Sequence, residues 1–251
     1  YKSTILISMS DPSFDPLFRE LHEKMMQQSF LVENPMLALA KQKSEQAPIL
    51  VEALRQYVRL PEEIVGFLQA AAGYFPKSHP LALELERNWQ QEQGSETGGV
   101  PHVELLKRLF ERDLAIDASQ VSSSPATKIF LTTIETGMRR SAWFAIGQAY
   151  ALEATAVPEL AILVGPLINA CAKMTNHVAP VDTELLQRSR VTIPRPQNRD
   201  EAFQLTMSDW LAMHILDFEV GHRDLLREAI VASSPSAEEQ REFIAGFQAL
   251  L

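Results

Sequence analysis

Apolar residues recur at three- and four-residue steps along most of the chain, which is the spacing of one face of an α-helix. The strict alternation that marks β-strands is nearly absent, and the chain has only 10 glycines. The first such segment, Asp15–Phe30, opens on an Asp-Pro pair, a common helix start. The pattern therefore predicts a chain built almost entirely of helices.

Prolines and polar connections divide this pattern into predicted helices of ordinary length and two long ones. The long ones cover Thr127–Ala156 and Arg199–Ser233, and Pro158 is expected to begin another helix, to about Lys173. The remaining helices are predicted at Met36–Lys43, Ile49–Arg59, Pro61–Ala72, Pro80–Gln93, Pro101–Leu114, Asp182–Arg190 and Ser236–Leu251. Residues 1–251 are thus expected to form a single all-α domain, a bundle of about seven to eight helices.

The composition and net charge of the chain argue against some kinds of binding partner. The 251 residues are 46% hydrophobic and carry a net charge of −9, without a Lys/Arg block, so a nucleic acid or an anionic membrane surface is not expected to bind. The apolar run Ala154–Ala172 contains Glu159 and two prolines, which favours a core helix over a membrane span. The opening residues lack the basic start and long apolar centre of a signal peptide, so a soluble cytoplasmic protein is expected.

Charged and imidazole side chains interrupt the apolar pattern of the late helix. His214, Asp217, Glu219 and His222 fall within the segment 210–226. Two imidazoles and two carboxylates are costly to bury unless they hydrogen-bond to each other or bind a cation. The alternative is that this face of the helix is exposed to water.

Three further residues place a carboxylate or an imidazole where a helix does not favour one, so a partner is expected for each. Glu92 lies in a last helical turn and His102 in a first one, where the helix dipole disfavours a carboxylate and an imidazolium respectively. Glu153 stands in a stretch with almost no other charge. The alternative for each of the three is an ordinary side chain exposed to solvent. Taken together, carboxylates and imidazoles without thiolates, on several helices of one bundle, suit a pair of iron or manganese ions.

The sequence resembles the haem-oxygenase-like diiron oxidases, a family that includes the chlamydial death-domain-associated protein and is related in fold to the TenA thiaminases. The resemblance spans nearly the whole chain. It rests on Asn34-Pro35, the segment FPKSHPLA at 75–82, the pattern Asn88…Glu92-x-Gly94…His102, Tyr150-Ala-Leu-Glu153 and the late helix. It implies a haem-oxygenase-like fold in which Glu92, His102, Glu153 and His222 bind metal, with two more ligands from the late helix.

The late helix departs from the usual spacing of the family, which is His, three residues, Asp, two residues, His. Counted back from His222, the acid is Glu219, and the first imidazole should be residue 215, which is Ile215. His214 lies one residue earlier. Either a π-bulge between His214 and Glu219 absorbs the extra residue, or His214 is not a ligand and Asp217 contributes instead.

The resemblance implies an O₂-dependent enzyme with two Fe(II) ions, although manganese suits the same ligands, in which Glu153 and His222 are central to catalysis. It also implies a small-molecule substrate, an external electron donor and a homodimer. We expect oxidation of an amino acid or an amino-acid derivative in secondary metabolism, by C–C cleavage, N-oxygenation or nitrile formation. Arg139 and Arg140 are candidates to bind a substrate carboxylate.

Three alternatives stay open at this stage. The first is a fatty-acid oxidative decarboxylase of the same family, and the second is a metal-free hydrolase of the TenA type, which needs a cysteine nucleophile. The one cysteine, Cys171, lies in an apolar run and is typical of a buried small hydrophobe. The third is a non-enzymatic helical interaction protein whose acids and imidazoles are exposed.

Overall fold

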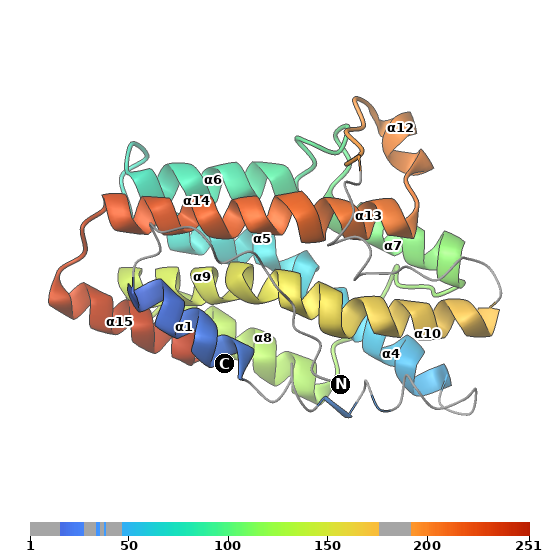
Figure 1. The fold of residues 1–251 in the computed structure, drawn as a ribbon, viewed down its shortest axis with the longest axis horizontal. Coiled ribbons are helices and arrows are strands. Elements are labelled where there is room, and N and C mark those ends of the chain that lie inside the picture. The colour runs from blue at the N-terminus through green and yellow to red at the C-terminus, as the bar shows by residue number, and fades with distance from the viewer. Residues whose placement is uncertain (1–15, 28–33, 36–37, 39–46, 176–191) are drawn as a thin grey trace.

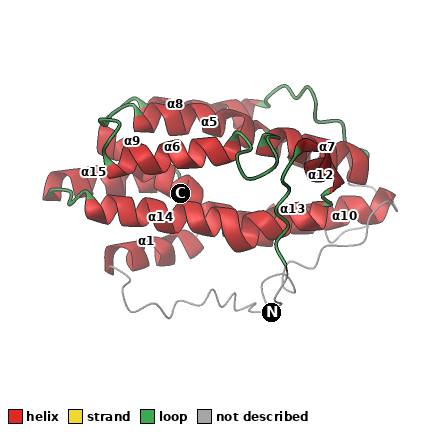
Figure 2. Ribbon diagram, turned by 90° about the horizontal axis from the view of Figure 1, so that it is seen from above, coloured by secondary structure: helices red, strands yellow, loops and turns green. Residues whose placement is uncertain are grey.

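The structure, a computed structural model, describes residues 16–27, 34–35, 38, 47–175 and 192–251, and all regular structure in them is helical (Figures 1 and 2). This confirms the predicted all-α fold. The predicted helices Met36–Lys43 and Asp182–Arg190 fall almost entirely outside the described residues. The first half of the described chain contains α1 (Pro16–Met26), α4 (Ala47–Tyr57), α5 (Arg59–Ala72), α6 (Pro80–Glu92), α7 (His102–Leu114) and α8 (Pro125–Met138).

Two long rods in the second half of the chain determine the architecture. The first joins α9 (Ala142–Pro158), the π-helix η1 (Glu159–Val164) and α10 (Gly165–Thr175). The second, preceded by α12 (Arg199–Gln204), joins α13 (Met207–Met213), the π-helix η2 (His214–Phe218) and α14 (Glu219–Ala232). The rods run along the long axis of the molecule, where α14 packs on α9 and α6, and η1 meets η2 (Figure 1). Each rod thus carries a π-helical turn near its middle, and the two turns are in contact.

Both long helices predicted from the sequence are interrupted, so those two predictions are wrong in extent. Instead of one helix over Thr127–Ala156, α8 ends at Met138 and α9 begins after Ser141, whose side chain accepts a hydrogen bond from the Phe144 amide. Instead of one helix over Arg199–Ser233, Thr206 begins α13 with a capping box. In both places a Ser or Thr side chain caps the start of a new helix, although the apolar period continues across the break.

Pro158 also behaves differently from the expectation that it begins a helix. It is the last residue of α9, and the rod continues through it into η1. Proline lacks an amide hydrogen and cannot join the regular series of backbone hydrogen bonds. The wider π-turn that follows accommodates this break. The rod therefore stays continuous past Glu159, the first residue of η1.

The last helix, α15 (Ala237–Gln248), has the capping box of Ser236 and Glu239 that the sequence predicts. It packs along α9 at close range, because Gly147 and Gly246 lie where a Cβ atom would overlap the backbone of the facing helix. Phe243, Phe247 and Tyr150 fill the space between these helices. Substituting either glycine would push the two helices apart.

The rod Ala142–Ala172 is long and apolar enough to cross a membrane by length and composition, with a mean hydropathy of 1.6 over its most apolar 18-residue window. However, 67% of its most apolar window is buried inside the bundle. Burial of this kind is typical of the core helix of a soluble protein, as the sequence predicts for this run.

Candidate metal centre

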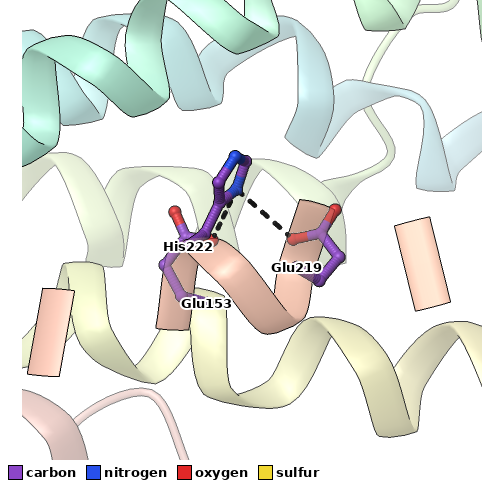
Figure 3. Close-up of side chains that lie close together, drawn as sticks. All are labelled: Glu153, Glu219 and His222. Atoms are coloured by element: carbon purple, nitrogen blue, oxygen red, sulfur yellow. Dashed lines mark ion pairs between the residues drawn. The ribbon is translucent and has the colours of Figure 1, made fainter. Parts of the chain in front are cut away.

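Two carboxylates and an imidazole meet between the two rods (Figure 3). Glu153 comes from α9, and Glu219 and His222 come from successive turns of α14. The Nδ1 atom of His222 lies 3.2 Å from Glu153 Oε2 and 3.8 Å from Glu219 Oε2. Two ligand atoms bound to one divalent cation at about 2.0–2.2 Å are separated by roughly 3–4 Å. The three side chains therefore have the separations that a shared cation requires.

A second group of candidate ligands lies beside the first. The Oε1 atom of Glu92, at the end of α6, lies 3.4 Å from Nδ1 of His102, at the start of α7. The rings of His102 and His214 are 4.9 Å apart between centroids. All three side chains line a cavity of about 70 Å³ that Glu153 and Glu219 line as well. One cavity thus receives candidate ligands from both groups.

The π-helix η2 accounts for the unusual spacing of the late helix. It covers His214–Phe218, directly between His214 and Glu219. The extra residue in the sequence is absorbed by this wider turn, so His214, Glu219 and His222 all turn toward the interior, with His214 and His222 3% and 1% exposed. The first of the two possibilities raised by the spacing, a π-bulge that keeps His214 at the site, is the one the structure contains.

Removing one residue from the π-turn should therefore preserve the site. Deletion of Leu216, which is only half-buried, would leave three residues between His214 and Glu219, and an α-helix places such residues on one face. We expect this deletion variant to bind metal with the same stoichiometry as the parent chain. Deletion of Val220 is the matched control, because an α-helical turn cannot absorb it and His222 would rotate away from Glu219. Metal titrations would check both; loss of metal in the Leu216 deletion alone would contradict this role of the π-turn.

Asp217, the other acid proposed for this helix, lies elsewhere. Its carboxylate forms an ion pair with Arg195 and is 31% exposed, and it does not line the cavity. Arg195 also binds Glu96 at 2.8 Å and lies over the ring of Phe218. The geometry therefore favours Glu219 over Asp217 as a ligand, and it gives Asp217 a role in holding the outer side of the π-turn.

The two late histidines each have one ring nitrogen fixed by an acceptor. Nε2 of His222 lies 2.9 Å from Oε1 of Gln91, and Nδ1 of His214 lies 2.8 Å from the backbone oxygen of Trp210. An oxygen of this kind only accepts, so each of these nitrogens carries the hydrogen. In the neutral imidazoles the other nitrogen then keeps a free lone pair, the arrangement found in metal-binding histidines. Asn88 supports the site similarly, by donating to Glu153 Oε1 at 3.1 Å.

The Gln91 contact leads to a quantitative prediction. A Gln91→Leu variant keeps the approximate volume but removes the acceptor for His222, so the ring loses its fixed tautomer and orientation. We expect metal affinity to fall roughly 10- to 100-fold, the usual effect of removing such a partner. Gln90→Leu, at an exposed neighbouring position, is the matched control and should bind as the parent does. Competition titration of Mn(II) against a chelator measures both variants, and unchanged affinity in Gln91→Leu would contradict the assignment.

Charge interactions among these groups are strong because the groups are buried. Burial alone would raise the pKa of Glu92, yet the adjacent His102 lowers it to about 2. Burial would lower the pKa of His222, but the charge and hydrogen bond of Glu153 raise it to about 9. Burial, with a smaller contribution from His102, lowers the pKa of His214 to about 3. Burial also places the pKa of Glu219 well above its usual range.

These features fit a bound metal. The side chain of His102 is only 2% exposed, and neither of its ring nitrogens has a hydrogen-bond partner among the described residues. Nδ1 of His222 faces two carboxylates, which leaves their charges to be balanced by protons or by a cation. The donors are oxygens and imidazole nitrogens without thiolates, a set that suits iron or manganese. Glu92, His102, Glu153, His214, Glu219 and His222 would hold the ions.

Some residues at the site escaped the sequence analysis. Gln91 is a partner of His222, and its signal was its position one residue before Glu92 on the same helix end. Glu159 and Tyr57 line the cavity. Glu159 stands in the sequence as a charge within an apolar run, and the reasoning that identifies Glu153 places it in a partly buried position as well. Tyr57 gave no signal that distinguishes it from an ordinary core aromatic.

Fold and site together define an all-α bundle protein with a buried glutamate–histidine cluster able to hold metal. Over residues 16–177, more than half of the chain, the sequence matches a domain family of unknown function, DUF3865, and the protein belongs to this family. No functionally curated protein matches the chain.

Two crystal structures resemble the chain over most of its length. Both are of a CADD-like protein of unknown function from Nostoc punctiforme PCC 73102, one at 2.00 Å and the other at 1.35 Å resolution. The first has 28% sequence identity and a TM-score of 0.72, and the match covers 93% of this chain and 90% of the other. The second has 27% identity and a TM-score of 0.68, with 93% and 87% covered. These matches extend the similarity to the C-terminal helices that lie outside the family match.

Proposed function

We propose that this protein is a non-haem diiron oxygenase or oxidase that uses O₂ to oxidise a small substrate. The observation that carries the proposal is a cavity lined by Glu92, Glu153, Glu219, His102 and His214, with His222 clustered against two of these glutamates and one nitrogen of His214 and of His222 already fixed. The resemblance to the haem-oxygenase-like diiron oxidases and the likeness to a CADD-like protein support the same reading.

Each part of the chain has a defined task in this proposal. Two iron ions bound by these ligands would supply the activation of O₂. Glu153 and His222 are the proposed central pair: their contact holds a proton in the metal-free protein, and they give it up when they bind metal. Asn88 and Gln91 orient this pair. Apolar side chains of Leu60, Ile64, Leu106 and Leu152 line the rest of the cavity and keep bulk water away.

The cavity lining bears on the kind of substrate. Among the described residues no Lys or Arg lines it. Arg139, 76% exposed, pairs with Glu135, and Arg140 lies over the ring of Phe144, so neither reaches the cavity. The carboxylate of a fatty acid or of an amino acid would therefore find no cationic side chain here, so the lining alone does not separate these two substrate classes. We retain an amino acid or amino-acid derivative as the proposed substrate class, with an external electron donor and a homodimeric assembly as further predictions.

The structure gives less support to the other two alternatives. Cys171 is buried in the apolar core, and burial raises the pKa of its thiol to about 11, which opposes a role as a TenA-type nucleophile. A plain interaction protein would expose its acids and imidazoles, whereas His102, Glu153 and His222 are 2%, 5% and 1% exposed. Burial of such groups without a cation would be costly.

Anaerobic titration with Fe(II), followed by a pulse of O₂, tests the proposal. We expect about two ions per chain, the number for which the two ligand groups provide, and a visible absorption change after the pulse. Protein loaded with Zn(II), which has no redox chemistry, is the control and should show no change. Binding of far less than one iron per chain, or no response to O₂ at full loading, would overturn the proposal.

A further inference from the structure

Glu159 is a carboxylate that the proposed metal ligands do not use. It is the first residue of η1, directly after the last residue of α9, and its side chain lines the cavity. No described residue forms a hydrogen bond or an ion pair with it. Nor does it belong with Glu153, Glu219 and His222, whose ligand atoms lie within 4.8 Å of one another. Glu159 therefore offers a free anionic group to whatever enters the cavity.

The surroundings of Glu159 make this free group unusual. Burial raises the pKa of Glu159 to about 7, and no positively charged side chain among the described residues counters the effect. Tyr57, which also lines the cavity, has a pKa raised well above its usual range by burial and then by the charge of Glu159, so its hydroxyl stays protonated. A partly buried carboxylate without a partner, as Glu159 is, is costly, and such groups in cavities are frequently binding groups.

The charge of the cavity defines what would satisfy Glu159. Four glutamates line it, namely Glu92, Glu153, Glu159 and Glu219, without a Lys or Arg among the described lining residues. Three of them belong to the proposed metal centre. The fourth is left for a group that is cationic and donates hydrogen bonds, which describes an ammonium group. Charge-assisted hydrogen bonds of this kind are among the strongest that proteins form.

We propose that Glu159 binds the ammonium group of an amine-bearing substrate and so selects amines over alcohols and acids of the same size. This inference rests on the proposed function, since it places the substrate beside the metal centre. The apolar walls would hold a short aliphatic body. The cavity of about 70 Å³ suits a molecule of a few carbon atoms, because about 10–15 Å³ of such space holds one water molecule.

Calorimetric titration of the Mn(II)-loaded protein with three four-carbon probes tests the proposal. The probes are n-butylamine, 1-butanol and butyrate. We expect the amine to bind about tenfold or more tightly than the alcohol, and butyrate to bind weakest. In Glu159→Gln the preference for the amine should fall to about twofold or less, while bound Mn(II) per chain stays as in the parent. Glu159→Asp should keep part of the preference, and Glu111→Gln, at an exposed position, should keep all of it.

Three results would overturn the proposal. The amine preference could survive in Glu159→Gln, which would place the amine on the metal or on another acid. Glu159→Gln could lose Mn(II), which would make Glu159 a metal ligand. Butyrate could bind best, which would place the probe on the Mn(II) ions instead of beside Glu159. If the parent chain binds no metal, the proposed function fails, and the same titrations on metal-free protein still decide whether Glu159 selects amines. Circular dichroism confirms that each variant is folded.

Discussion

Replacing Glu153 with alanine is expected to reduce bound metal from about two ions per chain to one or none, the largest effect of any single substitution in this protein. Glu153 lies 3.2 Å from Nδ1 of His222, belongs to the cluster with Glu219, and lines the cavity that also holds the second group of ligands. No other charged residue lies on α9, so no other side chain of this helix can replace it.

Removing the charge of Glu153 should affect the stability of the metal-free protein far less than it affects metal binding. A buried carboxylate in apolar surroundings is costly to keep, and Glu153→Gln retains the volume and the hydrogen bond from Asn88 while removing the charge. We therefore expect thermal unfolding of metal-free Glu153→Gln within a few degrees of the parent, alongside the loss of metal. Two ions bound with parental affinity in Glu153→Ala would contradict the proposed centre. Loss of metal together with unfolding in both variants would show a structural role instead.

Metal affinity is expected to rise steeply with pH. In the metal-free protein Glu153 holds the pKa of His222 at about 9, so below that pH a proton occupies the nitrogen that must bind the metal. Each ion that displaces this proton gains affinity about tenfold per pH unit. Between pH 6 and pH 9 the dissociation constant should therefore fall by about three orders of magnitude, and then level off. Burial raises the pKa of Glu219 as well, which adds to the slope in the same direction.

The stability of the metal-free protein is expected to change with pH in the opposite direction to its metal affinity. The pKa of His222 is raised above its ordinary value of 6.5 in the folded chain. Its contribution to the stability of the metal-free protein is therefore complete below pH 6.5 and is lost as the pH rises through about 9. Raising the pH should weaken the metal-free fold while it strengthens metal binding. Titrations of Mn(II) against a chelator at several pH values measure the first effect, and an affinity independent of pH over this range would contradict it.

The helical class and most residues of the candidate site can be predicted from the sequence because each rests on a local signal. Period-3.6 patterns gave the helices, and Glu92, His102, Glu153, His214, Glu219 and His222 stood out as charges or imidazoles on faces that a bundle must bury. The π-turn at His214–Phe218 could be foreseen as one of two possibilities, since a single extra residue separates two groups that must share a face.

Other features went unpredicted, either because a continuous apolar period concealed a local capping signal or because the contact joins residues distant along the chain. The breaks at Ser141 and Thr206 arise where a side chain caps a new helix inside an apolar pattern that would otherwise continue. Asp217 resembles a ligand in the sequence, but Arg195, distant along the chain, draws it to the outer side. Glu159 lines the cavity because the rod continues through Pro158 into a π-turn, which the usual rule for proline does not suggest.

The central claim is that this cavity binds two metal ions, and anomalous diffraction from crystals grown with Fe(II) under anaerobic conditions tests it most directly. We predict two peaks at the iron absorption edge. One should lie among Glu153, Glu219 and His222, and the other among Glu92, His102 and His214. Peaks only at the protein surface, or no peak inside the bundle at full iron supply, would contradict the account, and the buried acids and imidazoles would then have to be balanced by protons alone.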